Sequence, residues 1–228
     1  MRSTVVLVFA SLATAGACSG GSRGGSDTAV STNAAMPATS NGVVAAASGT
    51  VPASIEAIGH HGENAYDMVK AGDWAGARAS ADSLRPASDS VPAAASIAIR
   101  ELSQAITAKD RVEALRASNH LTELGALFSE PYHPQVPPEV TLLDYYGREL
   151  EISAATDDRA RLREIAVSMR RTWNTVRPQV EAHGGRSEAA KFDALIAQVE
   201  AARTPADYAK VATPVLDAVD TLEQVFTR

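Results

Sequence analysis

The first predicted helix carries one histidine and three carboxylates at a spacing that could support metal chemistry. Side chains three and four residues apart share one face of a helix. The four that do so here are Glu56, His60, Glu63 and Asp67, termed the acidic-His row. Imidazole and carboxylate groups are ligands that zinc, copper and iron accept, and helical bundles build metal sites from such rows. The row is therefore the candidate metal or small-ligand site.

A second interpretation is that the acidic-His row is a solvated helix face. At about 100° per residue, the apolar side chains of the same helix point roughly 150° away from it. Those apolar residues are Ile55, Ile58, Gly62, Ala65 and Val69. Since they must face the core, the acidic-His row is expected to face water, where a dry and selective metal site does not form.

Four arginines form a second candidate site on the longest predicted helix. They fall within about 40° of one another around the helix axis, and they are Arg159, Arg163, Arg170 and Arg177, termed the arginine row. Guanidinium groups in a row bind an anionic ligand or an acidic partner through paired hydrogen bonds. Alternatively, their stems cover the core edge while their heads pair with acids such as Glu149 or Glu151 on a neighbouring helix.

The sequence contains no motif that identifies a reaction. It lacks H-E-x-x-H, a phosphate-cradling glycine loop, a calcium loop and the C-x-x-C-H of covalent haem, and no cofactor is predicted. There is one cysteine, and 21 basic residues stand against 27 acidic ones, for a net charge of −6. This acidic balance argues against nucleic acid as a partner.

The elements that position these residues are predicted to be helices throughout, so the fold is expected to be all-α. The clearest helix has apolar residues at three- and four-residue steps, namely Leu162, Ile165, Ala166, Met169, Trp173, Val176 and Val180. Four short breakers predict helix N-caps, and they are Gly72-Asp73, Lys109-Asp110, Asp157-Asp158 and Thr204-Pro205-Ala206-Asp207. Further starts are predicted at Pro52, Pro92 and Pro137-Pro138, and Gly184-Gly185 closes the long helix.

About eight helices follow, arranged as four hairpins. Counted from the four caps, the fourth, seventh and eleventh positions are apolar in eleven of twelve cases, with Ser80 the small exception. This agreement predicts that each capped helix buries the same stripe. The irregular segment 130–138 divides the hairpins into two tandem four-helix halves, 51–129 and 139–228. Its prolines, three apart, have the period of a polyproline II helix, which predicts either a docking motif or a stiff spacer.

The N-terminal segment points to location. Arg2 precedes an apolar run too short to span a bilayer, and the small residues Ala15-Gly16-Ala17 precede Cys18. This arrangement resembles a bacterial lipoprotein signal peptide over residues 1–18, with Ala15 where leucine is usual. The resemblance implies removal of residues 1–17 and acylation of Cys18 by diacylglycerol and a further chain such as palmitate. An ordinary secretory signal is the alternative.

The organisation expected is therefore a signal peptide at 1–17, a lipidated Cys18 with a Gly/Ser/Ala-rich tether at 18–50, and the two halves joined by the linker 130–138. Ser19 after the cysteine favours the outer membrane, facing the periplasm, where the host has two membranes. The function expected is a lipid-anchored binding or scaffold protein of the cell envelope without catalysis. Its partners would be the membrane and another envelope protein. The alternative is a periplasmic metal or small-ligand carrier that uses the acidic-His row.

Overall fold

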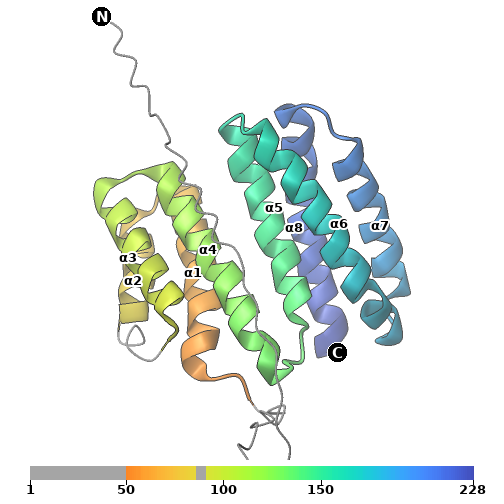
Figure 1. The fold of residues 1–228 in the computed structure, drawn as a ribbon, viewed down its shortest axis with the longest axis horizontal. Coiled ribbons are helices and arrows are strands. Elements are labelled where there is room, and N and C mark those ends of the chain that lie inside the picture. Colours follow the sequence, from red (N-terminus) through yellow and green to blue (C-terminus); the bar gives the residue numbers. More distant parts are fainter. Residues whose placement is uncertain (1–49, 86–90) are drawn as a thin grey trace, which may run out of the picture. The chain divides into compact units, whose positions relative to one another are not determined.

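The computed structural model describes residues 50–85 and 91–228, and within these ranges the fold is all-α, as predicted (Figure 1). The described residues form eight α-helices and a 3-10 turn at Glu130–Tyr132, and they contain no strand. The helices are α1 (Ala53–Ala71), α2 (Trp74–Leu84), α3 (Ala93–Ala108), α4 (Arg111–Ser129), α5 (Pro138–Ala155), α6 (Arg159–Ala182), α7 (Arg186–Ala201) and α8 (Pro205–Thr227).

The even-numbered helices begin at the caps that the sequence predicts. The side chains of Asp73, Asp110 and Asp158 each accept a hydrogen bond from a backbone N–H three residues on, at 2.9–3.1 Å. Thr204 forms a capping box with Asp207. Because each cap satisfies a backbone donor that the helix itself leaves unpaired, the start of each second helix in a hairpin is fixed locally.

The buried apolar residues form two separate clusters, one in each group of four helices. The first set, α1–α4, contains the cluster around Ile58, Leu102 and Leu121. The second set, α5–α8, contains the cluster around Trp173, Phe192 and Val219. Trp173, one of the largest fully buried side chains, donates a hydrogen bond from its indole N–H to Asp193 at 2.7 Å.

A pair of glycines allows α1 and α4 to pack closely inside the first set. A Cβ added at Gly125 would lie 2.8 Å from the Cα of Gly59, so a side chain at position 125 would clash with backbone. Helices normally pack with their axes 8–10 Å apart, and small residues permit the shorter separations. This contact fixes α4, whose opposite side faces the second set.

The segment between the two sets is not a continuous polyproline II helix. Glu130–Tyr132 forms a 3-10 turn, and His133 has a positive φ of 49°, which interrupts any regular left-handed repeat over the prolines. Gln135 donates a hydrogen bond to the carbonyl oxygen of Phe226 at 2.8 Å. The segment is therefore held against the end of α8.

None of the described helices is both long and apolar enough to cross a membrane. The predicted signal peptide, Cys18 and most of the tether lie outside the described residues.

Candidate functional site

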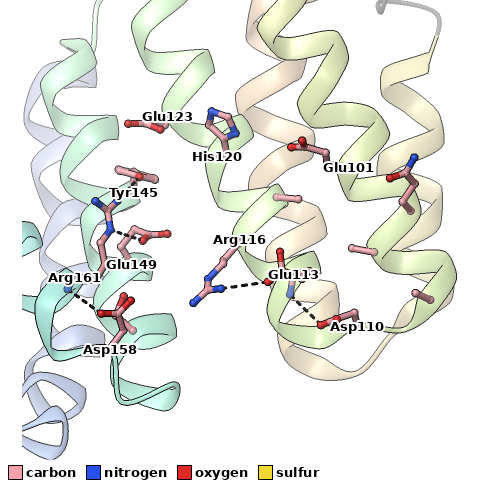
Figure 2. Close-up of a pocket in the computed structure, with 15 residues that line it drawn as sticks. Glu101, Asp110, Glu113, Arg116, His120, Glu123, Tyr145, Glu149, Asp158 and Arg161 are labelled. Atoms are coloured by element: carbon pink, nitrogen blue, oxygen red, sulfur yellow. Dashed lines mark hydrogen bonds and ion pairs between the residues drawn. The ribbon is translucent and has the colours of Figure 1, made fainter. Parts of the chain in front are cut away.

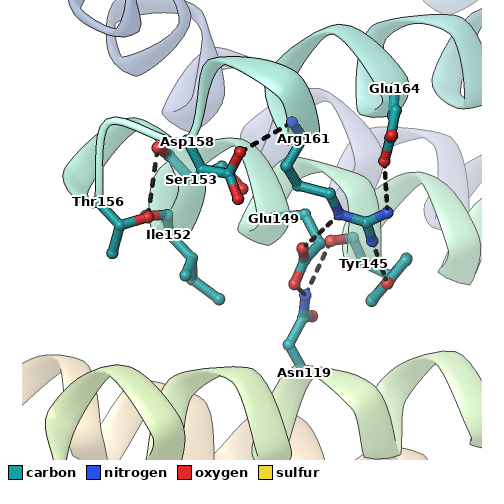
Figure 3. Close-up of polar contacts among 9 residues, drawn as sticks. All are labelled: Asn119, Tyr145, Glu149, Ile152, Ser153, Thr156, Asp158, Arg161 and Glu164. Atoms are coloured by element: carbon teal, nitrogen blue, oxygen red, sulfur yellow. Dashed lines mark hydrogen bonds and ion pairs between the residues drawn. The ribbon is translucent and has the colours of Figure 1, made fainter. Parts of the chain in front are cut away.

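The two helical sets meet through polar side chains on α4 and α5, which pack against each other. Asn119 of α4 is fully buried and donates hydrogen bonds to the carbonyl oxygen of Tyr145 at 3.1 Å and to Glu149 at 3.0 Å. Arg161 of α6 donates to the other carboxylate oxygen of Glu149 at 3.3 Å and to the Tyr145 hydroxyl at 3.0 Å. Figure 3 shows Asn119, Glu149 and Arg161 joined in one network. The network links three helices from both sets.

A cleft of about 870 Å³ opens beside this network (Figure 2). Its walls come from α3 and α4 of the first set and α5 and α6 of the second, and it is termed the cleft below. Its charged or titratable lining residues are Glu101, Asp110, Glu113, Arg116, His120, Glu123, Tyr145, Glu149, Asp158 and Arg161.

The cleft is acidic. Six carboxylates line it against two guanidinium groups. Both guanidinium groups already pair within the chain, Arg116 with Glu113 at 3.2 Å and Arg161 with Glu149 at 3.3 Å. Glu101 forms no ion pair with any residue that the structure describes. A field of this sign favours a cation in the cleft.

Two acidic groups in the cleft have pKa values raised by burial. Burial raises the pKa of Glu123, against the opposing effect of the nearby His120 and Arg161. Burial also raises the pKa of the Tyr145 hydroxyl, and the charges of Glu149 and Glu123 add to this effect. Tyr145 therefore stays neutral and acts as a hydrogen-bonding group.

The arrangement of the cleft suits binding. Ser153 lines it at 2% exposure, and its hydroxyl forms no hydrogen bond with another described residue. The histidine rings that do form hydrogen bonds in the described ranges are His60, with Asn64, and His183, with the carbonyl oxygen of Gln179. No serine–histidine nucleophile pair is thus formed among these residues, and Ser153 remains as an open hydrogen-bonding group for a ligand.

The acidic-His row is divided by the structure. Glu56, His60 and Asp67 are exposed on α1, whereas Glu63 is half-buried. The five apolar residues opposite the row are buried, as the helix geometry predicts. The described residues contain no group of three or more His, Cys, Asp or Glu side chains placed to hold a metal ion.

Glu63 instead lies in an acidic cluster with residues of the second set. Burial raises its pKa to about 7, and the nearby charge of Asp144 adds to the effect. Burial likewise raises the pKa of Asp144 to about 6 and that of Glu223 to about 7. Arg148 lies 3.0 Å from Asp144, but its single charge does not offset the burial of three carboxylates.

The arginine row is also divided. Arg170 binds both carboxylate oxygens of Glu200 at 2.7–2.8 Å, and Arg177 binds Asp193 at 2.9 Å. These acids belong to α7 and were not among the partners expected, because Glu149 pairs with Arg161 and Glu151 with Lys70. Arg159 and Arg163 remain at the start of α6, where neither contacts an acid of α7.

Sequence spacing missed the cleft. Its walls combine His120 and Glu123 of α4 with Tyr145 of α5 and Arg161 of α6, and no periodicity within one helix relates these residues. The only signal was the set of polar residues at buried positions of α4, such as Ser118, Asn119 and Thr122. Comparison of the chain with family models, with curated proteins and with solved structures gave no match.

Proposed function

We propose that this protein is a lipid-anchored binding module of the cell envelope whose cleft receives a positively charged segment of another envelope protein. The sequence before and including Cys18 supports the anchor, through its resemblance to a lipoprotein signal peptide. The acidic lining of the cleft supports a cationic partner. No catalytic step is part of the proposal.

The observation that carries the proposal is the excess of carboxylates in the cleft. Both lining arginines are occupied within the chain, while Glu101 on α3 and Glu123 on α4 stand on the wall of the first set. A lysine or arginine side chain entering the cleft would gain charge-assisted hydrogen bonds from these acids. The hydroxyl of Ser153, in the opposite wall, has no hydrogen-bond partner among the described residues and offers a further contact.

Binding to a defined cationic probe tests the cleft. The full chain in nonionic detergent is titrated with a lysine-rich decapeptide, and the same titration is run on Glu101→Gln/Glu123→Gln. Loss of two partly exposed ion pairs is expected to weaken binding roughly fivefold. Glu56→Gln, an exposed acid of α1 away from the cleft, is the control and should bind as the unaltered protein does.

The same variants identify the natural partner in cells. A photo-crosslinking residue at Gln104, which lines the cleft, should capture a partner that the Glu101→Gln/Glu123→Gln form captures poorly. A probe at exposed Arg171 on α6 is the control position. Equal capture from both positions, or capture indifferent to the two glutamates, would contradict the assignment of the cleft.

Fractionation tests the anchor separately. Cys18→Ser removes the only thiol of the chain, and the protein is expected to move from the membrane to the soluble fraction while its helical content is unchanged. Continued membrane association of Cys18→Ser would contradict lipid anchoring, but it would not contradict the proposal that the cleft binds a cationic segment.

A further inference from the structure

A small recess with three arginines lies in the second set, away from the cleft. Its volume is about 160 Å³, and it forms where α6 begins beside the turn between α7 and α8. Its lining includes Arg159, Leu162, Arg163, Arg203, Pro205 and Tyr208, and no acid is part of the lining. The charged residues of the recess are therefore all basic, whereas those of the cleft are mainly acidic.

Two of the three guanidinium groups form hydrogen bonds within the chain. Arg203 donates from Nη1 to the carbonyl oxygens of Glu200 at 2.7 Å and Ala202 at 3.0 Å, at the end of α7. Arg159 donates from Nε to Asp157 at 3.2 Å, which leaves both of its terminal nitrogens available. A guanidinium fixed by one edge presents its remaining N–H groups at little further entropic cost.

Arg163 is the free cation of the recess. Unlike Arg170 and Arg177 farther along α6, it forms no ion pair with any residue in the described ranges. Its charge is therefore not cancelled locally.

Tyr208 supplies a neutral donor. The residue is 5% exposed and lines the recess, yet its hydroxyl forms no hydrogen bond with another described residue. A buried tyrosine normally finds a hydrogen-bond partner for its hydroxyl. The recess is an open space next to Tyr208.

Two helix starts lie near the recess, since α6 begins at Arg159 and α8 at Pro205. The carboxylates of Asp158 and Asp207 accept hydrogen bonds from backbone N–H groups there, at 3.0 Å in each case, and their charges offset the two helix dipoles. Neither carboxylate lines the recess, so the arginines are the source of its positive charge.

We propose that this recess binds one phosphate-type oxyanion through Arg159, Arg163, Arg203 and the Tyr208 hydroxyl. Its volume lies below the 300–1,000 Å³ typical of pockets for drug-sized ligands, which suits a single phosphate group. The phosphate group belongs either to a soluble compound or to a lipid headgroup, since both present the same oxygens to the arginines.

Titration with inorganic phosphate tests the site. Binding to the full chain in nonionic detergent is followed by phosphorus NMR line broadening and by thermal stability. Arg163→Gln is expected to weaken binding about tenfold, because a charge-assisted hydrogen bond is lost, and Tyr208→Phe less than that. Arg171→Gln on the same helix removes one exposed arginine outside the recess and should change binding less than twofold. Equal effects of Arg163→Gln and Arg171→Gln would overturn the proposal.

Vesicle binding distinguishes the two sources of phosphate. The Cys18→Ser protein is mixed with phosphatidylcholine vesicles with or without phosphatidylglycerol, and bound protein is measured by sedimentation. Binding that requires phosphatidylglycerol and Arg163, without a response to inorganic phosphate, assigns the site to a headgroup. Binding of inorganic phosphate that requires Arg163, with no binding to vesicles, assigns it to a soluble compound. If neither ligand depends on Arg163, the recess is not an oxyanion site.

Discussion

At the scale of single residues, three carboxylates gather between the two sets at buried or half-buried positions. Glu63 comes from α1, Asp144 from α5 and Glu223 from α8, and each lies near at least one of the others. Arg148 is 9% exposed, pairs with Asp144, and stacks over the Tyr66 ring at 4.9 Å. One guanidinium cannot neutralise three acids, so part of the cluster is stable only when protonated.

Stability is therefore expected to fall as the pH rises from about 5 to about 8. The pKa values of Glu63 and Glu223 are raised to about 7 in the folded protein, so the folded state holds protons that the unfolded chain releases from about pH 4.5 upward. The contribution of these two glutamates to stability is fully present below their pKa in the unfolded chain. It is lost as the pH rises through their pKa in the folded protein. Chemical denaturation across this range should show that the free energy of unfolding falls by several kcal/mol, on the order of 3 kcal/mol for each of the two groups.

Glutamine at both positions mimics the protonated acids and checks the cause of the pH dependence. Glu63→Gln/Glu223→Gln should flatten the dependence and be more stable than the unaltered protein at pH 8. Glu56→Gln on the exposed face of α1 should leave the dependence unchanged. An unaltered slope in the double variant would show that other groups cause it.

At the scale of elements, the helix boundaries were predictable because they are encoded locally. Asp110 precedes its helix and accepts from the N–H of Glu113, and both residues lie within four positions of sequence. The contact between Asn119 and Glu149 is different, because 30 residues separate them and neither their spacing nor their residue types predict that they pair. The sequence thus predicted the starts of the helices and the buried stripe, but not the cleft that α3, α4, α5 and α6 form together.

The close contact between the two glycines of α1 and α4 predicts a loss of stability on substitution of Gly125 by alanine, whereas helix propensity alone predicts a gain. Gly125→Ala should destabilise the protein by about 2 kcal/mol, because its Cβ would lie 2.8 Å from the Cα of Gly59. Gly59→Ala is the matched control, since its Cβ would make an ordinary contact at 3.9 Å from the Cα of Gly125. Alanine favours a helix over glycine by about 1 kcal/mol, so Gly59→Ala should be neutral or stabilising in urea denaturation. Equal losses in the two variants would contradict the close approach.

At the scale of the described fold, two apolar clusters are joined by a polar boundary. Lys70 and Tyr66 of α1 both bind Glu151 of α5, at 2.7 and 2.9 Å, and Asn119 of α4 binds Glu149. Such contacts fix how the two sets are oriented but contribute little net free energy of folding, because each polar group loses its hydration when the contact forms. The free energy that holds each set together therefore comes mainly from its own cluster.

The two clusters should accordingly lose stability separately. Leu102→Ala on α3 and Ile196→Ala on α7 each remove a fully buried side chain distant from the polar boundary, at a cost of about 2–5 kcal/mol. Hydrogen exchange measured by mass spectrometry is expected to speed up in α1–α4 for Leu102→Ala and in α5–α8 for Ile196→Ala, since local opening follows the contacts that are lost. Uniform acceleration over both sets in either variant would show that the network of Asn119, Glu149 and Arg161 couples them into one cooperative unit. The cleft between the sets would then be a rigid groove, and a partner would enter it without any opening of one set against the other.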